Sequence, residues 1–178
     1  GKPALDPLYK ALKDPNPVTS SMAQNAFLEF GESAIVPLIS GLFDADTEIR
    51  KVSENALIRI GEPIVPHLIE ELTLRREPDR EPIFVVISHS GEPAIPYLIK
   101  NLTPVKGEKS KIMIQLLSRL GAVTIPSLIH AVKEQSDLSA LREAFLSMGR
   151  RSFPFLEDAL ERARGKTAVF IVDLLRQI

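Results

Sequence analysis

The chain contains no cysteine and no tryptophan, and its 178 residues include only 8 phenylalanines and 2 tyrosines. Without cysteine, disulfides, thiolate metal sites and cysteine nucleophiles are all excluded. Such a chain suits a reducing compartment, and no segment reads as a signal peptide, so we expect a cytoplasmic protein. The scarcity of aromatic side chains also argues against a site that stacks the bases of single-stranded nucleic acid.

An excess of charge of either sign is missing as well. The sequence carries 22 Lys and Arg against 23 Asp and Glu, a net charge of -1. That balance argues against a globally basic nucleic-acid binder and leaves only a local basic patch to consider. Apolar runs are short, with Ile83–Ile87 a typical example, and we expect no membrane-spanning helix. Hydrophobic residues still make up 44% of the chain, which is enough for a substantial core.

What the sequence does contain is proline together with regularly spaced glycine. The segment GEPAIPYLIKNL recurs upstream as GEPIVPHLIEEL and, with more changes, as GESAIVPLISGL. The copies, which we call repeats, begin at six phase glycines: Gly1, Gly31, Gly61, Gly91, Gly121 and Gly149. A fixed period of this length is the signature of a repeat protein. We therefore expect a single domain built of six repeats, covering residues 1–30, 31–60, 61–90, 91–120, 121–148 and 149–178.

Each repeat predicts two helices, which we call A and B. Positions are counted forward or backward from the nearest phase glycine. Helix A has apolar residues at +3, +4, +7, +8 and +11: Ala94, Ile95, Leu98, Ile99 and Leu102 in repeat four. Helix B follows a polar turn and has apolar residues at -9, -5, -4 and -1: Val52, Ala56, Leu57 and Ile60 in repeat two. Both spacings are typical of an amphipathic helix and do not fit the alternation of a strand.

Glycine and proline explain where these helices begin and end. A helix often ends at a glycine in the left-handed α conformation, so we expect helix B to end at each phase glycine. Two residues later come Pro3, Pro63 and Pro93, at the start of helix A, where a missing N–H costs little. A second proline follows at Pro66, Pro96, Pro126 and Pro154. It either still occupies a position with a free N–H or bends helix A slightly.

The GEPAIPxLI pattern, followed by a second helix such as IRKVSENALIRIG, resembles the short HEAT repeats, in particular the variety named after the phycobilisome lyases. The resemblance covers essentially the whole chain. It implies an all-α fold of the armadillo-like superfamily, a right-handed α-α superhelix (solenoid) of about six two-helix HEAT-like repeats. Tetratricopeptide repeats have a longer period and an aromatic signature that are not present here. The resemblance says little about function, because this repeat serves in scaffolds, regulators, a few enzymes and DNA-repair proteins.

Catalytic motifs are missing from the sequence. None of the histidines, His67, His89 and His130, is followed by glutamate, so the His-Glu pairs of the di-iron deoxyhypusine hydroxylase relatives are absent. No glycine-rich phosphate loop and no Gly-x-Ser-x-Gly elbow occurs. His67 with Glu70 and Glu71 has a helical spacing that could hold a metal, but a solvated helix face is the simpler interpretation. We expect a protein that is not an enzyme and needs no cofactor or metal.

A binding surface is expected on helix B, which the resemblance places on the concave side of the solenoid. With -9, -5, -4 and -1 in the core, positions -10, -6 and -2 form an exposed row. This B-helix row is basic in the middle repeats, and the turns before helix B add Arg75, Arg76, Arg80, Lys106 and Lys109. The candidate binding residues are Lys51, Asn55, Arg59, Arg80, His89, Lys111, Gln115 and Arg119. They would form a shallow basic groove for an acidic peptide, a phosphate or a nucleic-acid backbone, or merely a solvated face.

The leading hypothesis is a non-catalytic scaffold or adaptor that binds a protein partner on its concave surface. The alternatives are a lyase-like or regulatory subunit that holds a substrate protein, or a domain that binds nucleic acid or phosphate. Repeat three departs most from the pattern, because Pro82 occupies a core position of helix B and should mark its start. The apolar last helix, AVFIVDLL, is explained equally well by a segment of a longer array and by a natural terminal repeat.

Overall fold

The computed structural model describes residues 5–12, 14, 16–102 and 107–178. Gly1, Pro3 and Lys106 of the patterns above lie outside these residues. Throughout the described ranges the secondary structure is helical, with no strand, so the expected all-α class is confirmed. Two compact units are present, the N-terminal unit Gly1–Ser90 and the C-terminal unit Gly91–Ile178, and their boundary falls between repeats three and four.

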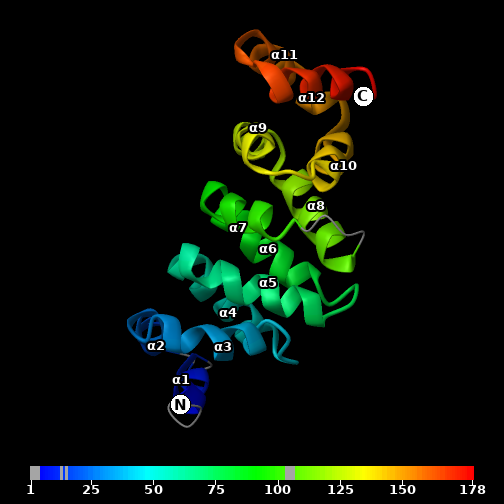
Figure 1. The fold of residues 1–178 in the computed structure, drawn as a ribbon. Helices are drawn as coiled ribbons and strands as arrows, with labels where there is room; N and C mark the ends of the chain where they lie inside the picture. Colours follow the sequence, from blue (N-terminus) through cyan, green and yellow to red (C-terminus); the bar gives the residue numbers. More distant parts are fainter. Residues whose placement is uncertain (1–4, 13, 15, 103–106) are drawn as a thin grey trace. The chain divides into compact units, whose positions relative to one another are not determined.

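The N-terminal unit contains the helices of the first three repeats (Figure 1). Its elements are α1 (Leu5–Leu12), α2 (Pro17–Glu29), α3 (Glu32–Gly41), α4 (Thr47–Ile60), the 3₁₀ turn η2 (Glu62–Ile64), α5 (Val65–Leu74) and α6 (Glu81–Ser90). Helix α6 begins one residue before Pro82, as the proline predicted, because a residue in the first helical turn needs no N–H.

The C-terminal unit contains three more helix pairs, each preceded by a 3₁₀ turn. Its elements are η3 (Glu92–Ala94), α7 (Ile95–Lys100), α8 (Glu108–Leu120), η4 (Gly121–Thr124), α9 (Ile125–Glu134), α10 (Ser139–Met148), η5 (Gly149–Ser152), α11 (Phe153–Arg162) and α12 (Gly165–Leu175). The odd-numbered helices are the predicted A helices and the even-numbered ones the predicted B helices.

Within each unit the helices pack in two layers. Every A helix packs against the B helix that follows it, for example α3 against α4 and α9 against α10. Consecutive B helices also pack together: α2 with α4 and α4 with α6 in the N-terminal unit, and α8 with α10 and α10 with α12 in the C-terminal unit. The A helices do the same, since α3 contacts α5, and α9 contacts both α7 and α11. Each unit therefore has an A layer and a B layer.

The core is made by the positions that the repeat pattern assigned to it. In repeat four all five helix A positions are buried, from Ala94 to Leu102. In helix B the -9, -5 and -4 positions of repeats two and four are buried, and the -1 residues, Ile60 and Leu120, are half-buried. The predicted amphipathic faces are therefore the ones that pack, and their burial is the main stabilising contribution to the fold.

The phase glycines differ in one respect from the expectation. The five that the structure describes have φ between 51° and 78° but ψ between -144° and -129°. Positive φ is confirmed, whereas the predicted left-handed α conformation is wrong. The backbone lies instead in the mirror image of the β region, which a Cβ atom disfavours even more strongly. A single residue in this conformation ends helix B and redirects the chain into helix A.

The two prolines of each repeat turn out to belong to separate elements. Pro63 and Pro93 lie in the short 3₁₀ turns η2 and η3 that follow the glycine. Pro66, Pro96 and Pro126 stand at the first or second position of the α-helix proper, where the N–H has no intrahelical partner. Of the two explanations for the second proline, the free N–H position is therefore the correct one in these repeats.

One stretch of the described chain, Glu108–Glu134, is long and apolar enough to cross a membrane by length and composition. It is not one continuous helix, because α8 ends at Leu120 and η4 separates it from α9. A membrane-spanning helix keeps its backbone hydrogen bonds throughout the apolar region, which the break at Gly121 interrupts. The expected absence of a membrane span stays a prediction.

Replacing Gly121 by Ser should destabilise the protein by about 1–3 kcal/mol, the usual cost of a side chain in such a backbone region. No atom lies within 4 Å of a Cβ built there, so the cost comes from the backbone alone. Gly107→Ser at the other end of α8 is the matched control. Its φ of -96° and ψ of 159° suit any residue, and it adds a favoured N-cap, so it should be neutral or stabilising. Urea unfolding followed by circular dichroism compares them, and equal losses would contradict the explanation.

Replacing Ser53 by Ala should stabilise the protein by on the order of 1 kcal/mol. Its Oγ is buried at the crossing of α3 and α4 and has no hydrogen-bond partner among the described residues, so the mutation removes an unsatisfied group. Ser152→Ala is the control, because that buried hydroxyl donates to Gly149 O at 2.8 Å and its loss should cost about 1 kcal/mol. Thermal unfolding distinguishes the two, and a loss of stability in both variants would count against this view of Ser53.

Candidate functional site

The B-helix row of the N-terminal unit is exposed on α4. Lys51, Asn55 and Arg59 all face solvent. Lys51 is paired within its own helix, with Nζ 3.1 Å from Glu48 Oε1. Asn55 and Arg59 make no side-chain hydrogen bond or ion pair with any residue that the structure describes. The predicted exposure of this row is confirmed, while its use for binding stays a prediction.

On α6, which packs against α4, the row is less basic. His89 is exposed, and its Nδ1 lies 2.9 Å from the carbonyl oxygen of Val85, one turn earlier in the same helix. Because a carbonyl oxygen can only accept, Nδ1 is the ring nitrogen that carries a hydrogen and donates it. The other ring nitrogen, Nε2, is not used in this bond. Glu81 completes the row on α6 and is also exposed.

Arg80 does not belong to the exposed surface, and its inclusion among the candidate binding residues was wrong. It is only 5% exposed, and its Nε donates to the carbonyl oxygens of Arg75 at 2.8 Å and Leu72 at 3.3 Å. Those carbonyls lie in the last turn of α5 and just beyond it, where no intrahelical donor remains. Arg80 therefore holds the end of α5 in the irregular turn of repeat three.

Arg75 also makes contacts within the fold and is not a free cation on the surface. Its guanidinium makes an ion pair with Glu71 at 2.6 Å and lies 3.5 Å from the centre of the Phe43 ring. Stacking on an aromatic face and pairing with a carboxylate are the roles in which Arg differs from Lys. The turn of repeat three therefore adds fewer free cations than its sequence suggested.

In the C-terminal unit the row runs along α8 and continues on α10. Lys111, Gln115 and Arg119 are exposed on α8, and Glu143 and Ser147 are exposed on α10, which packs directly against α8. Lys111 and Gln115 make no side-chain hydrogen bond or ion pair with the described part of the chain. The two helices thus present a surface with cations on α8 and a carboxylate on α10.

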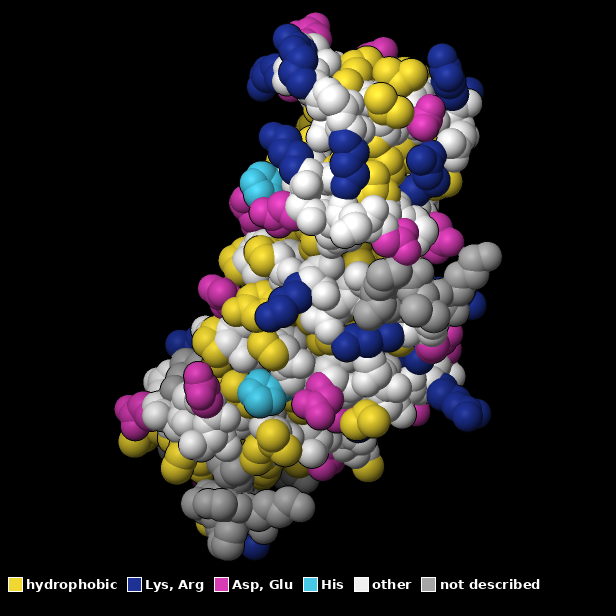
Figure 2. Space-filling view, viewed as in Figure 1, with side chains coloured by type: hydrophobic (Ala, Val, Ile, Leu, Met, Phe, Trp, Pro, Cys, Tyr) yellow, Lys and Arg dark blue, Asp and Glu magenta, His cyan; other side chains and the backbone are white. Residues whose placement is uncertain are grey.

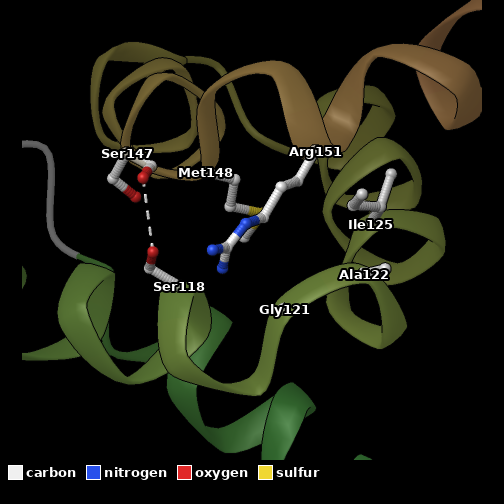
Figure 3. Close-up of a pocket in the computed structure, with 7 residues that line it drawn as sticks. All are labelled: Ser118, Gly121, Ala122, Ile125, Ser147, Met148 and Arg151. Atoms are coloured by element: carbon white, nitrogen blue, oxygen red, sulfur yellow. Dashed lines mark hydrogen bonds between the residues drawn. The ribbon is translucent and has the colours of Figure 1, made fainter.

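A hollow of about 350 Å³ opens between the ends of α8 and α10 (Figure 3). That volume lies at the lower end of the range of about 300–1,000 Å³ found for small-molecule sites. Its walls come from the last turns of both helices and from the turns that follow them. The lining residues are Ser118, Gly121, Ala122, Ile125, Ser147, Met148 and Arg151.

The hollow combines one cation with an apolar floor. In Figure 3 the Arg151 side chain extends from η5 into the hollow, with its guanidinium between Ser118 and Met148. Ile125 and Met148 are buried and present apolar surface. Ser118 Oγ donates to the carbonyl oxygen of Ser147 at 3.3 Å and joins the two helices across the hollow. The seven lining residues thus carry one positive charge and no negative charge.

Two other hollows in this unit lie between neighbouring A helices, one between α7 and α9 and one between α9 and α11. Each has an acidic side chain beside a basic one or a histidine among its own lining residues. His130 Nδ1 lies 3.6 Å from Glu134 Oε1 in the first, and Arg162 lies 2.8 Å from Asp158 Oδ1 in the second. The hollow with Arg151 differs because no acidic side chain lines it.

The sequence pattern did not single out Arg151, although a signal was present. Position +2 after the phase glycine holds Ser33, Pro63, Pro93 and Val123 in repeats two to five, and a charged residue only in the last repeat. Ser118 also stands at -3 of its helix, where repeats one, two and five have leucine or isoleucine. Ser118 and Arg151 both differ from the residues found at their positions in most other repeats, and both line the hollow. Those two differences were the signal in the sequence for this site.

No metal site is apparent in the described residues, where no group of three or more His, Cys, Asp or Glu side chains lies close enough together to hold an ion. His67, Glu70 and Glu71 accordingly do not form one.

The pKa of Asp137 is lowered because the backbone N–H and the hydroxyl of Ser139 donate hydrogen bonds to its carboxylate. This contact lies at the start of α10 and stabilises that helix end.

Figure 2 shows how charge is distributed over one face. Within each unit, the Lys and Arg side chains in this view stand among acidic and uncharged ones. A broad basic field is what sequence-independent binding to a nucleic-acid backbone needs. The face in view therefore favours contacts made by individual side chains.

No family model matches the sequence, and no curated protein matches it. Among solved structures, the crystal structure of an engineered protein, a Northeast Structural Genomics Consortium target, is similar at 16% sequence identity with a TM-score of 0.33. That match covers 97% of this chain and 95% of the engineered one. A TM-score this low carries no conclusion about fold or function.

Replacing Arg80 by Met, which keeps the length of the side chain, should cost about 2 kcal/mol or more of unfolding free energy. The variant leaves the carbonyls of Leu72 and Arg75 without their charged donor in a buried place. Arg59→Met on the exposed row is the control and should stay within about 0.5 kcal/mol. Urea unfolding measures both. A neutral Arg80 variant would return this residue to the list of candidate surface residues.

Proposed function

We propose that the chain is a HEAT-type α-solenoid, a right-handed superhelix of two-helix repeats, that binds a protein partner through the exposed rows of its B helices. The proposal is supported by the repetition of one helix pair in both units. It is also supported by the separate A and B layers inside each unit, which are the arrangement expected of stacked repeats.

The observation that carries the proposal is the contrast between two sets of positions on the same helices. On α4 and α8 the residues at -9, -5 and -4 are buried, while those at -10, -6 and -2 are exposed. Because consecutive B helices pack side by side within a unit, their exposed positions form a surface of several helices. A surface of this kind suits an extended partner better than a small substrate.

The chemistry of the rows favours a protein partner over the alternatives. Asn55, Arg59, Lys111 and Gln115 are polar side chains without described partners, and each can form a hydrogen bond to a peptide. The rows also carry the exposed carboxylates of Glu81 and Glu143, which give less support to a nucleic-acid partner. A lyase-like or regulatory subunit that holds a substrate protein would use the same surface, with the chemistry supplied elsewhere.

Charge reversal on the rows tests the proposal. Lys51→Glu with Arg59→Glu changes the N-terminal unit, and Lys111→Glu with Arg119→Glu changes the C-terminal unit. The captured partner is identified by affinity purification and then titrated against the purified chains by calorimetry. At least one double variant should weaken binding by tenfold or more, equivalent to about 1.4 kcal/mol.

The matched control is Lys100→Glu with Lys133→Glu, which makes the same change of charge on exposed positions of the A helices α7 and α9. It should leave the affinity within about twofold. Equal weakening by the control would show a general effect of net charge and would contradict a site on the B helices. Binding to duplex DNA that weakens steeply with salt would favour the nucleic-acid alternative.

A further inference from the structure

We infer that the hollow between α8 and α10 binds a carboxylate of the protein partner. Arg151 is the counter-ion of that carboxylate, and an apolar group next to it packs on Ile125 and Met148. The inference rests on the proposed function, because it names the chemistry of the partner at one place on the B-helix surface. Ser147 belongs both to the exposed row of α10 and to the wall of the hollow, so the two surfaces are continuous.

Arg151 is exposed, and the hollow around it favours an anion. Arg151 provides the one formal charge among the seven lining residues, and it makes no ion pair or hydrogen bond with the described residues. A guanidinium has five N–H donors in a planar arrangement that matches the two oxygens of a carboxylate. The hollows between the A helices each include an acidic side chain among their lining residues, Glu134 in one and Asp158 in the other. The hollow at Arg151 lacks that internal anion.

The serines favour a peptide carboxylate over a phosphate group. Ser118 Oγ donates its proton to the carbonyl oxygen of Ser147, and Ser147 Oγ donates its proton to the carbonyl oxygen of Ala144 at 2.7 Å. Since both hydroxyl protons are already engaged, a group in the hollow can use these serine oxygens only as acceptors. A phosphate has three oxygens that all require donors, whereas a peptide supplies backbone N–H groups that can use these acceptors.

The floor of the hollow selects for an apolar group beside the carboxylate. Ile125 is 1% exposed and Met148 is 7% exposed, so both are held in place by packing and present only a small apolar area. The flexible thioether of Met148 adapts to differently shaped apolar groups. A glutamate or aspartate next to a leucine-sized residue would therefore use both the cation and the floor.

Methionine methyl NMR offers a direct test. The chain has three methionines, and each occupies a different environment. Met148 lines the hollow, Met113 is buried in α8, and Met22 is exposed on α2 in the other unit. With ¹³C-methyl methionine in the full chain, a ligand in the hollow should shift the Met148 signal and leave the Met22 signal in place. Met113 reports whether the core is intact.

The probe is the blocked dipeptide N-acetyl-Leu-Glu-amide, and its neutral partner is N-acetyl-Leu-Gln-amide. We expect a saturable shift of the Met148 methyl signal with the Glu dipeptide. The concentration needed should be millimolar, since a single ion pair that is exposed to solvent is weak. The Gln dipeptide should bind at least fivefold more weakly. N-acetyl-leucine, which carries a terminal carboxylate, shows whether a chain end is accepted as well as a side chain, and inorganic phosphate tests the competing anion.

Arg151→Gln should weaken the Glu dipeptide to the level of the Gln dipeptide. Arg150→Gln is the matched control, because Arg150 is the exposed neighbour in the same 3₁₀ turn and does not line the hollow. It should leave the affinity unchanged within about twofold. An unchanged Met113 signal in both variants shows that neither one has lost its fold.

Three results would overturn the inference: equal binding of the Glu and Gln dipeptides, equal weakening by the two arginine variants, or a stronger response to phosphate than to either carboxylate. None of them depends on the natural partner. If the row variants abolish partner binding while the dipeptides show no preference for Glu, the proposed function stands and the inference is wrong. If the dipeptides behave as expected while the row variants have no effect, the hollow is a carboxylate site but the B-helix rows are not the partner surface.

Discussion

The structure depends on one backbone constraint, the conformation of the phase glycine between helix B of one repeat and helix A of the next. At Gly61 the N–H closes the last turn of α4 on Leu57, and the carbonyl oxygen accepts the N–H of Ile64 at 3.2 Å. One residue therefore ends one helix and provides the first acceptor of the next. Only a residue without a Cβ reaches the required combination of positive φ and strongly negative ψ at little cost.

This junction also sets which residues enter the core. Position +3 is fully buried in every repeat where the structure describes it, as Ala34, Ile64, Ala94, Thr124 and Ser152. In the last two the hydroxyl donates to the carbonyl oxygen of its own phase glycine, so a polar side chain is tolerated there without an unsatisfied group. The faces of both helices are then fixed relative to the glycine, which explains why all five core positions of helix A are buried in repeats two, three and four.

Much of the architecture was predictable from the sequence because it depends on local and periodic features. The helix pairs, the buried positions and the exposed row on α4 and α8 follow from the spacing of apolar residues, and the helix starts follow from proline. The ψ angle of the glycines was not predictable, since glycine permits several positive-φ regions and only the packing of the two helices selects one. The division into two compact units, Gly1–Ser90 and Gly91–Ile178, was not anticipated either.

The roles of individual arginines were predicted least well, and the reason is physical. The same side chain has three different environments. Arg59 faces solvent, Arg80 is buried against backbone carbonyls, and Arg151 extends into a hollow. A long side chain can place its charge far from its own Cα, so its role depends on which acceptors happen to lie within reach.

A repeat protein nevertheless offers an internal standard for this question. Ser118 of repeat four stands where repeats one, two and five have leucine or isoleucine, and Arg151 of repeat six stands where repeats two to five have serine, proline or valine. The helix junction itself does not require these residues, because other repeats form the same junction without them. Arg151, which makes no hydrogen bond or ion pair with the described residues and meets Ser118 across the hollow, is therefore the departure for which a binding role is expected.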